Sequence, residues 1–221
     1  MLFNKSAIMY QRLFLIIVFL SGFAFNQSIA QYSNANKVQL PTGWSLTPAG
    51  NSIPLSGDLP LNMAISPDKQ FLAITNNGGG RQAIDLIDLR TNKWVQEVAI
   101  SKAWLGLAFE TSRPYLYASG ADNNIIIRFE LKNGQLVTKD TLSLGAPWPK
   151  EHISPAGITL DEKNNRLYVV SRLNQSLYTC DTRTMKVISR TQLSTEPYSC
   201  IYNNTKKELY ISAWGGKKVW V

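Results

Sequence analysis

A six-residue pattern that occurs four times constrains the fold of this chain more than any other feature. Its copies are residues 60–65, 104–109, 155–160 and 197–202. Each copy is an apolar run that is followed, seven positions after its last residue, by Leu72, Leu116, Leu167 or Leu209. A second apolar run begins at each leucine, and the polar turn between the two runs predicts a β-hairpin. The constant offset indicates one structural unit that is repeated.

Two further strands are expected after each hairpin. The third strands are expected at residues 83–89, 125–131, 176–181 and 218–221, and the fourth at 94–100, 136–144 and 186–193. The last residues of the first strands, Ile65, Phe109, Leu160 and Tyr202, are 44, 51 and 42 residues apart. A period in the forties with four strands per unit is typical of propeller blades. The sequence therefore predicts an all-β protein, a β-propeller of four-stranded blades with four blades in residues 59–221.

A blade that is apolar on both faces buries them only between two neighbouring blades. Aromatic residues within the expected strands are therefore expected in the core: Trp94, Tyr115, Tyr117, Tyr168 and Tyr210. The sequence stops at Val221, within the third strand of the fourth blade, so this blade is expected to be truncated. Because an unpaired blade leaves an exposed edge and an apolar face, we expect a fragment of a longer product. A complete ring would have about seven blades.

The first thirty residues have the organisation of a secretory signal peptide. Lys5 and Arg12 precede an apolar run from 13 to 20, and Ser28 and Ala30 are the small residues expected before a cleavage point near Gln31. A single membrane anchor is the competing interpretation, but the run is short against the roughly 20 residues of a spanning helix. We expect a periplasmic or secreted product with no stable membrane span after cleavage. Residues 31–58 are expected to be irregular, with a short strand within 43–47.

The charge of the mature chain limits the class of ligand. Removal of residues 1–30 takes away two cations, Lys5 and Arg12, and no acid, so the formal charge falls from +8 to +6. A basic surface suits anionic ligands or nucleic acid. Export argues against nucleic acid as the ligand. Anionic cell-surface polymers or phosphorylated substrates would suit the same positive electrostatic field.

Two cysteines, Cys180 and Cys200, would be free to form a disulfide in an oxidising compartment. Cys180 is expected in an outer strand of one blade and Cys200 in the innermost strand of the next. Buried free thiols are therefore the favoured interpretation, with a disulfide as the alternative.

Several short motifs point to a known repeat family. They are Ser66-Pro67-Asp68, Leu86-Ile87-Asp88-Leu89, Leu116-Tyr117, Pro155-Ala156-Gly157, Leu167-Tyr168-Val169 and Leu209-Tyr210-Ile211. Through them, residues 55–221 resemble the YVTN-type (YncE-like) propeller family, whose repeat is WD40-like in architecture. This resemblance implies the fold and says little about function.

Residues 40–50 and 58–63 together resemble secreted bacterial proteins in which such a propeller precedes an alkaline-phosphatase-like phosphoesterase domain. The resemblance implies a hydrolase in the longer parent protein, with this downstream domain as a partner of the propeller. The metal-binding carboxylates and histidines of a phosphoesterase would lie beyond Val221.

Ligands of propellers usually bind where the blade-to-blade connections and the hairpins between second and third strands converge, which we call the channel face. The connections are expected at residues 55–60, 101–104, 145–154 and 194–197, and the hairpins at 76–82, 120–124, 172–175 and 214–217. The candidate ligand-binding residues on this face are Arg81, Trp104, Trp148, Lys150, His152, Arg172 and Trp214.

The connection at 145–154 accounts for the long spacing of 51 and contains His152, the single histidine of the chain. It is interpreted either as a lid with an aromatic and a titratable group or as a proline-stiffened loop that packs Trp148 on its neighbour. The glycine-rich hairpin before Arg81 is interpreted either as an anion cradle or as an ordinary flexible turn.

Motifs of catalysis and of metal binding are missing from the sequence. It has no P-loop, Cys-x-x-Cys pair, nucleophile elbow or His-Glu-x-x-His motif. We therefore name no catalytic residue, metal site or cofactor, and whether the parent protein is an enzyme stays open. The first hypothesis is a binding or scaffold propeller with an unknown, anionic ligand. The alternatives are a propeller enzyme of the lactonase type and a basic propeller that binds anionic polymers or nucleic acid.

Overall fold

The structure of the protein is a computed structural model that describes residues 38–46 and 51–221. Two compact units divide between Ser52 and Ile53. The first contains a short antiparallel hairpin of β1 (Val38–Gln39) and β2 (Ser45–Leu46), and β2 falls where a short strand was expected. The expected signal peptide lies outside the described residues. Within the described ranges, no helix is long and apolar enough to cross a membrane.

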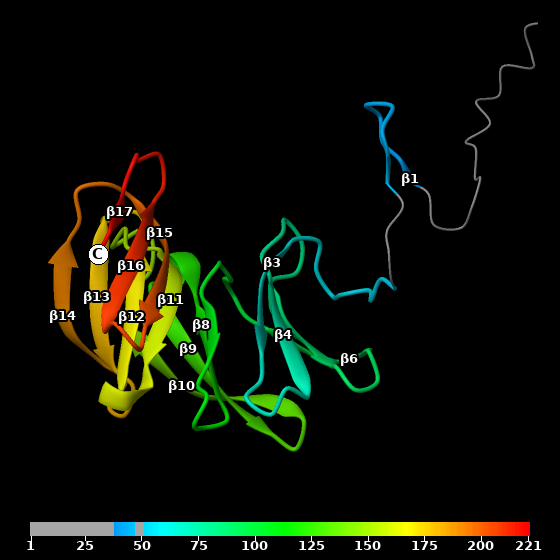
Figure 1. The fold of residues 1–221 in the computed structure, drawn as a ribbon, viewed down its shortest axis with the longest axis horizontal. Coiled ribbons are helices and arrows are strands. Elements are labelled where there is room, and N and C mark those ends of the chain that lie inside the picture. Colours follow the sequence, from blue (N-terminus) through cyan, green and yellow to red (C-terminus); the bar gives the residue numbers. More distant parts are fainter. Residues whose placement is uncertain (1–37, 47–50) are drawn as a thin grey trace, which may run out of the picture. The chain divides into compact units, whose positions relative to one another are not determined.

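The second unit consists of four antiparallel sheets in which each strand pairs with the next along the chain (Figure 1). Blade 1 contains β3 (Pro60–Ile65), β4 (Phe71–Asn76), β5 (Ala83–Asp88) and β6 (Lys93–Ala99). Blade 2 contains β7 (Leu107–Phe109), β8 (Tyr115–Ser119), the 3-10 turn η1 (Ala121–Asn123), β9 (Ile125–Lys132) and β10 (Gln135–Ser143). Blade 3 contains β11 (Pro155–Asp161), η2 (Glu162–Asn164), β12 (Arg166–Ser171), β13 (Ser176–Asp181) and β14 (Lys186–Gln192).

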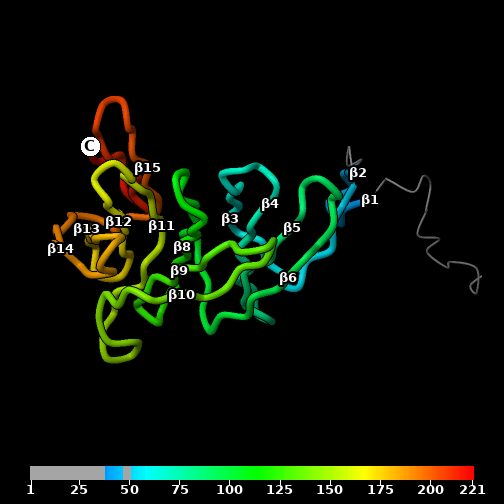
Figure 2. Tube along the Cα trace, turned by 90° about the horizontal axis from the view of Figure 1, so that it is seen from below, coloured from blue at the N-terminus to red at the C-terminus, as the bar shows by residue number. Residues whose placement is uncertain are grey.

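Blade 4 contains β15 (Pro197–Asn203), β16 (Glu208–Ala213) and β17 (Val219–Trp220). The blades follow one another in chain order, from the cyan of blade 1 to the red of blade 4 (Figure 2). With 53% strand and 3% helix, the prediction of an all-β chain with propeller blades is confirmed.

The first strand of blade 2 is shorter than expected, because β7 begins at Leu107 and Trp104 lies in the connection before it. The Gly106 N–H donates to the Ser119 hydroxyl at 2.9 Å, outside the regular ladder. In blade 1 the N–H of Asn62 donates to Thr75 Oγ1 in the same way, at 3.0 Å. A hydroxyl on the second strand therefore satisfies a backbone donor where the first strand leaves register.

The core lies between the blades. Tyr117 of blade 2 is fully buried and lies in one cluster with Leu167 and Val169 of blade 3. Trp94 does not meet the same expectation, because 45% of it is exposed and its indole N–H donates to Asp85 Oδ1 at 2.7 Å. It lies on β6, the outermost strand of blade 1, where the neighbouring blade covers less of the surface.

Both cysteines are free and buried, as expected. Cys180 lies in the core between blades 2 and 3, whereas Cys200 lies in the core between blades 3 and 4. Burial raises the pKa of each thiol to about 12.

Two glycines, one directly before the first strand of blade 2 and one in the first strand of blade 3, allow neighbouring blades to approach closely. A Cβ added at Gly106 would lie 2.3 Å from the carbonyl oxygen of Ala156 in blade 3. A Cβ added at Gly157, the same repeat position, would lie 2.6 Å from Ser199 Cα in blade 4. Neither space accepts a larger side chain, so glycine is required in blades 2 and 3, whereas blades 1 and 4 have Asn62 and Ser199 at the same repeat position.

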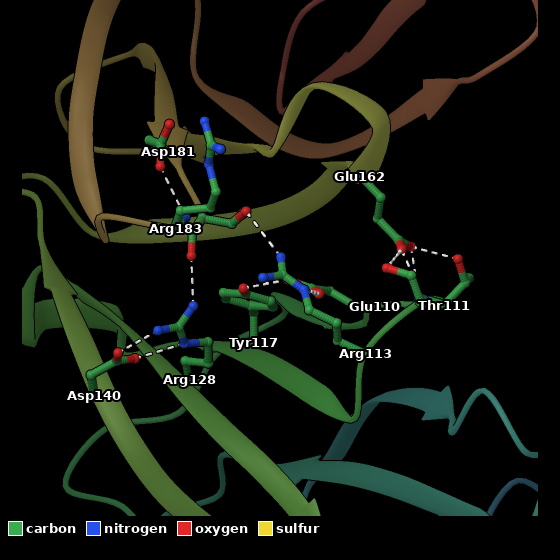
Figure 3. A network of polar contacts seen from close by, with 11 residues as sticks. Glu110, Thr111, Arg113, Tyr117, Arg128, Asp140, Glu162, Asp181 and Arg183 are labelled. Atoms are coloured by element: carbon green, nitrogen blue, oxygen red, sulfur yellow. Dashed lines mark hydrogen bonds and ion pairs between the residues drawn. The ribbon is translucent and has the colours of Figure 1, made fainter.

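Polar contacts join blades 2 and 3 at the end where the first strands run into the second (Figure 3). The carboxylate of Glu162 accepts hydrogen bonds from the N–H and hydroxyl groups of both Thr111 and Ser112. Burial opposes the charged form of Glu162, but these four bonds outweigh it and hold its pKa below the usual value. We call this contact the Glu162 clamp.

A second group of buried charges lies beside the clamp (Figure 3). Glu110 is fully buried, accepts a hydrogen bond from the Tyr117 hydroxyl at 2.6 Å and forms an ion pair with Arg113. Arg128 pairs with Asp140 within blade 2 and donates to the carbonyl oxygen of Thr182 in blade 3 at 2.6 Å. The carboxylates are therefore paired rather than left as isolated buried charges.

The outer faces of the first and last blades are apolar and open. Met63 and Ile65 of β3 are 64% and 57% exposed, and Ile201 and Val219 of blade 4 are 67% and 60% exposed. Apolar side chains of the first and the last blade are therefore exposed to solvent.

Candidate ligand-binding pocket

A cavity of about 190 Å³ lies at the end of the blades where the hairpins between second and third strands meet the blade-to-blade connections. Blades 1, 2 and 3 and the two connections between them all contribute side chains. We call this cavity the blade-end pocket, and its lining residues are Asn77, Gln82, Lys102, Ala103, Trp104, Ala121, Asp122, Ser154 and Arg172.

Arg172 and Trp104 form the cationic part of the pocket. The guanidinium carbon of Arg172 lies 5.2 Å from the centre of the Trp104 ring, which is within the range of a cation–π contact. Arg172 Nε donates to Glu196 Oε1 at 2.6 Å. Within the described part of the chain, the side chain of Arg172 makes hydrogen bonds through Nε alone, so its terminal N–H groups are available to a ligand. Lys102 adds a second, exposed cation.

Trp104 also contains an unusual polar atom. Its indole N–H is buried and has no hydrogen-bond partner among the described residues. A buried donor without a partner costs about 1–3 kcal/mol. The ring lies against Arg172 and packs on the buried cluster of blades 3 and 4, so packing rather than hydrogen bonding fixes its position; the cluster consists of Ala156, Val170, Cys200 and Ile211.

The two amide side chains of the pocket are each held by one end. Asn77 donates from Nδ2 to the carbonyl oxygen of Ala103 at 2.9 Å, and Gln82 accepts at Oε1 from the N–H of Ala103 at 2.8 Å. Asn77 Oδ1 and Gln82 Nε2 make no hydrogen bond to a described residue. The same holds for the Asp122 carboxylate and the Ser154 hydroxyl. The walls therefore offer both donors and acceptors, and the orientation of Asn77 and Gln82 is fixed by their bonds to Ala103.

The long connection at 145–154 is fixed on blade 2 beside the pocket. Asn124 is buried, has a φ of +57°, and donates from Nδ2 to the carbonyl oxygens of Ala146 at 2.5 Å and Glu151 at 2.8 Å. Its Oδ1 accepts from the N–H of Ser154 at 2.9 Å. A single side chain therefore holds both ends of the connection, and Ser154 enters the pocket wall directly after it.

Trp148 and His152 form a stacked pair on this connection. Their ring centres are 3.9 Å apart and their planes differ by 19°. The N–H of Trp148 donates to the carbonyl oxygen of Asp122, a pocket residue, at 2.9 Å. The Trp148 side chain packs on its own loop, and 50% of it is exposed. The pair is therefore a flat, accessible aromatic surface next to the pocket.

The structure brings together only part of the residue set that the sequence suggested. Trp104 and Arg172 line the pocket, while Trp148 and His152 lie beside it and Lys150 is exposed on the same connection. Arg81 instead forms an ion pair with Glu97 of β6 at 3.0 Å. Trp214 packs on Tyr198 of blade 4 in a tilted arrangement, with ring centres 4.7 Å apart and planes that differ by 43°, and is 58% exposed.

Sequence reasoning missed the neutral and acidic residues of the pocket. Asn77, Gln82, Asp122 and Ser154 all lie within the hairpins and the connection that were assigned to the channel face. Nothing in the repeat singles them out, because every blade has polar residues in its turns. Their convergence depends on how three blades are placed around one point.

A larger cavity of about 560 Å³, which the sequence did not predict, lies between blades 1 and 2 at the opposite end. Its walls include Pro67, Phe71, Arg113, Pro114 and Leu131. At the interface between blades 2 and 3, the same end is closed by the Glu162 clamp. In the repeat, Thr111 takes the place of Glu162 and Pro67 the place of its first partner, and proline has no N–H to donate. Hydrogen bonds equivalent to those of the clamp are therefore missing from the interface between blades 1 and 2.

Among the described residues, no group of three or more histidine, cysteine, aspartate or glutamate side chains is placed to hold a metal ion.

No protein-family model matches the sequence, and no curated protein is significantly similar to it. Solved structures do resemble it. A functionally unknown protein from Desulfotomaculum acetoxidans is 16% identical with a TM-score of 0.61, over 70% of this chain and 49% of that chain. A protein from Lactobacillus plantarum is 15% identical with a TM-score of 0.61, over 78% and 52%.

The β-propeller domain of Cps50 (Swd1) from Myceliophteria thermophila is 13% identical with a TM-score of 0.58, over 70% of this chain and 50% of that chain. The chain thus spans about half the length of the solved proteins that it matches. At these identities the likeness concerns the fold alone. The chain has the fold of a β-propeller.

Proposed function

We propose that this protein is a non-catalytic binding propeller and that its blade-end pocket holds an anionic group of the ligand. The observation that carries the proposal is the arrangement of Arg172, whose guanidinium lies over Trp104 and is held by Glu196 through Nε alone. The remaining N–H groups form the planar fork that suits a carboxylate or a phosphate. Lys102 supplies a second positive charge to the same group.

The chemistry of the pocket supports binding rather than turnover. Ser154 is the one hydroxyl side chain in the lining, and no described histidine or carboxylate is hydrogen-bonded to it as a base. His152 stacks on Trp148 instead. The lactonase-type alternative requires several polar side chains that converge on one point, which Asn77 and Asp122 begin to supply. We expect no hydrolysis of lactones or of p-nitrophenyl phosphate, and turnover that Asp122→Asn abolishes would favour the enzyme.

The binding proposal is tested by titration of the full chain with galacturonate and with inorganic phosphate, monitored by calorimetry and tryptophan fluorescence. Arg172→Gln should weaken binding of the anion about tenfold or more, because it removes the fork that pairs with it. Arg81→Gln is the matched control, since Arg81 is a cation near the same end whose partner is Glu97. Equal effects of the two substitutions would contradict a site at Arg172.

The proposal includes export. The charged start, the apolar run and the small residues before Gln31 support a cleaved signal peptide. Mass spectrometry of the protein from a periplasmic fraction or the medium should show a chain that begins near Gln31. A chain that retains Met1 in the membrane fraction would contradict it.

We further propose that the propeller is YncE-like and belongs to a longer protein with further blades and a phosphoesterase domain. The motif resemblance supports this proposal, as do the two open apolar faces and the fact that the chain spans about half the length of the structures it matches. Reading the gene downstream of codon 221 is the direct test. A stop codon at the next position would contradict a downstream partner domain.

A further inference from the structure

The blade-end pocket is too small to enclose a whole ligand of ordinary size. Its volume of about 190 Å³ equals that of about six water molecules at roughly 30 Å³ each. Ligand pockets usually have volumes of about 300 Å³ or more. A single small unit whose anionic group is held at Arg172 would fill it, so the rest of a larger ligand must lie on the surface beside it.

That neighbouring surface is the Trp148 and His152 pair. We call the exposed ring of Trp148 the Trp148 platform. The N–H of Trp148 donates to the carbonyl oxygen of Asp122, which lines the pocket, so the platform is carried by a residue in direct contact with the pocket wall. Half of the Trp148 side chain is exposed, and the loop that carries it is fixed by Asn124. A rigid indole offers a large contact area at low entropic cost. A flat ring with an apolar face would therefore bind there.

The pocket wall selects among ring-bearing anions. Asn77 Oδ1, Gln82 Nε2, the Ser154 hydroxyl and the Asp122 carboxylate are hydrogen-bonding groups without a partner among the described residues. Hydroxyl groups pair with all of them, since a hydroxyl both donates and accepts. The Asp122 carboxylate accepts from a sugar hydroxyl but repels a second phosphate. The wall thus combines one cationic corner with several sites for hydroxyls.

We infer that the blade-end pocket and the Trp148 platform together bind an acidic oligosaccharide. The carboxylate of one uronate unit lies on Arg172 and Lys102, its hydroxyls meet Asp122 and the neighbouring amides, and the next sugar ring stacks on Trp148. This inference rests on the proposed anion site and adds the class of ligand and a second contact. Nucleic acid, the other polymer with charges and flat rings, is disfavoured because it would place a row of phosphates near Asp122.

The test compares ligands of different length on the full chain. Galacturonate, tri-galacturonate, maltotriose and an oligothymidylate are titrated at one low salt concentration, with binding measured by calorimetry. We expect tri-galacturonate to bind about tenfold tighter than galacturonate, and maltotriose to bind more weakly than both. Trp148→Ala should reduce the affinity for tri-galacturonate to that for galacturonate and leave the affinity for galacturonate unchanged. Trp148→Tyr should restore most of the difference.

Matched substitutions separate the two contacts. Arg172→Gln should weaken the binding of galacturonate and of tri-galacturonate alike. Trp214→Ala removes a tryptophan of similar exposure, 58% against 50% for Trp148, outside the pocket and should change neither affinity. Thermal unfolding of each variant checks that the fold is intact.

Each result bears on a different part of the inference. If tri-galacturonate binds no tighter than galacturonate while Arg172→Gln still weakens both, the second contact is refuted and the anion site stands. If neither ligand binds and inorganic phosphate does not bind either, the anion site fails as well. Equal affinity for maltotriose would refute the acidic class, and tighter binding of the oligothymidylate that depends on Arg172 and Trp148 would assign the site to nucleic acid.

Discussion

Replacement of Gly157 by alanine is the sharpest test of how the blades are held together. The added Cβ would lie 2.6 Å from Ser199 Cα, 2.9 Å from the carbonyl oxygen of Tyr198 and 3.0 Å from the N–H nitrogen of Cys200. All three atoms belong to the backbone of β15, so no side chain can rotate away. Relative to an ordinary contact of 3.4 Å, the shortfall at Ser199 is 0.8 Å.

The cost follows from this geometry. To relieve the contact, β15 must move away from β11 by nearly 1 Å, and the apolar contacts between blades 3 and 4 loosen. Overpacking of this kind costs about 1–3 kcal/mol. Alanine also lowers the entropy of the unfolded chain, which stabilises by about 0.4–1 kcal/mol. We expect Gly157→Ala to lower the free energy of unfolding by about 2 kcal/mol more than the same substitution does at a glycine in open space.

Gly79→Ala supplies that reference, because an added Cβ at Gly79 has no atom within 4 Å. Urea denaturation of both variants, followed by fluorescence, gives the difference in unfolding free energy with the entropy effect shared between them. In hydrogen exchange, the amides of β15, β16 and β17 should lose protection before those of the other blades, since the added methyl group collides with the backbone of β15. If the two variants differ by less than about 0.5 kcal/mol, the close approach at Gly157 does not stabilise the fold.

Three further predictions concern the clamp, the thiols and the open faces. The folded-state pKa of Glu162 is below its usual 4.5, so its contribution to stability is present above that value and is lost as the pH falls through the folded-state pKa. Glu162→Gln should remove this part of the acid dependence of the unfolding free energy. An unchanged pH profile of the variant would contradict the clamp. With thiol pKa values of about 12 and buried side chains, Cys180 and Cys200 should resist alkylation at neutral pH until urea unfolds the chain, as measured by mass spectrometry; rapid labelling of the native protein would argue against their burial. The exposed Ile65 and Ile201 should cause self-association of the isolated chain that lysine substitutions reduce, and a monomer peak of the unsubstituted chain in gel filtration would contradict this.

The blade organisation was predictable because it depends on local signals. The leucine seven positions after each first strand places the hairpins, and β4, β8, β12 and β16 each begin one residue before these leucines. The fourth strands were placed to within a residue or so for the same reason. The length of β7 was not predictable, since it depends on the hydrogen bond between Gly106 and a hydroxyl of the next strand.

The candidate site was predictable only as a set of loops. The repeat alignment placed Trp104 and Arg172 on one face, and the structure puts them in contact. It placed Arg81 and Trp214 on the same face, but an ion pair with Glu97 and a contact with the tilted ring of Tyr198 hold these residues outside the pocket. Both partners belong to the same blade as the residue they hold, so partner choice is decided by distances between strands of the folded sheet, which a single sequence does not contain.

The sequence by itself determined that this chain forms β-propeller blades, because periodicity, turn residues and the leucine offset act over distances of a few residues to one blade. The tertiary structure alone decided which seam is closed by the Glu162 clamp and which stays open, where the backbones approach at Gly157, and that Asp122, Arg172 and Trp104 surround one cavity. The physical reason is that these features join residues of different blades. Their distances depend on how each sheet packs on the next rather than on the order of residues within it.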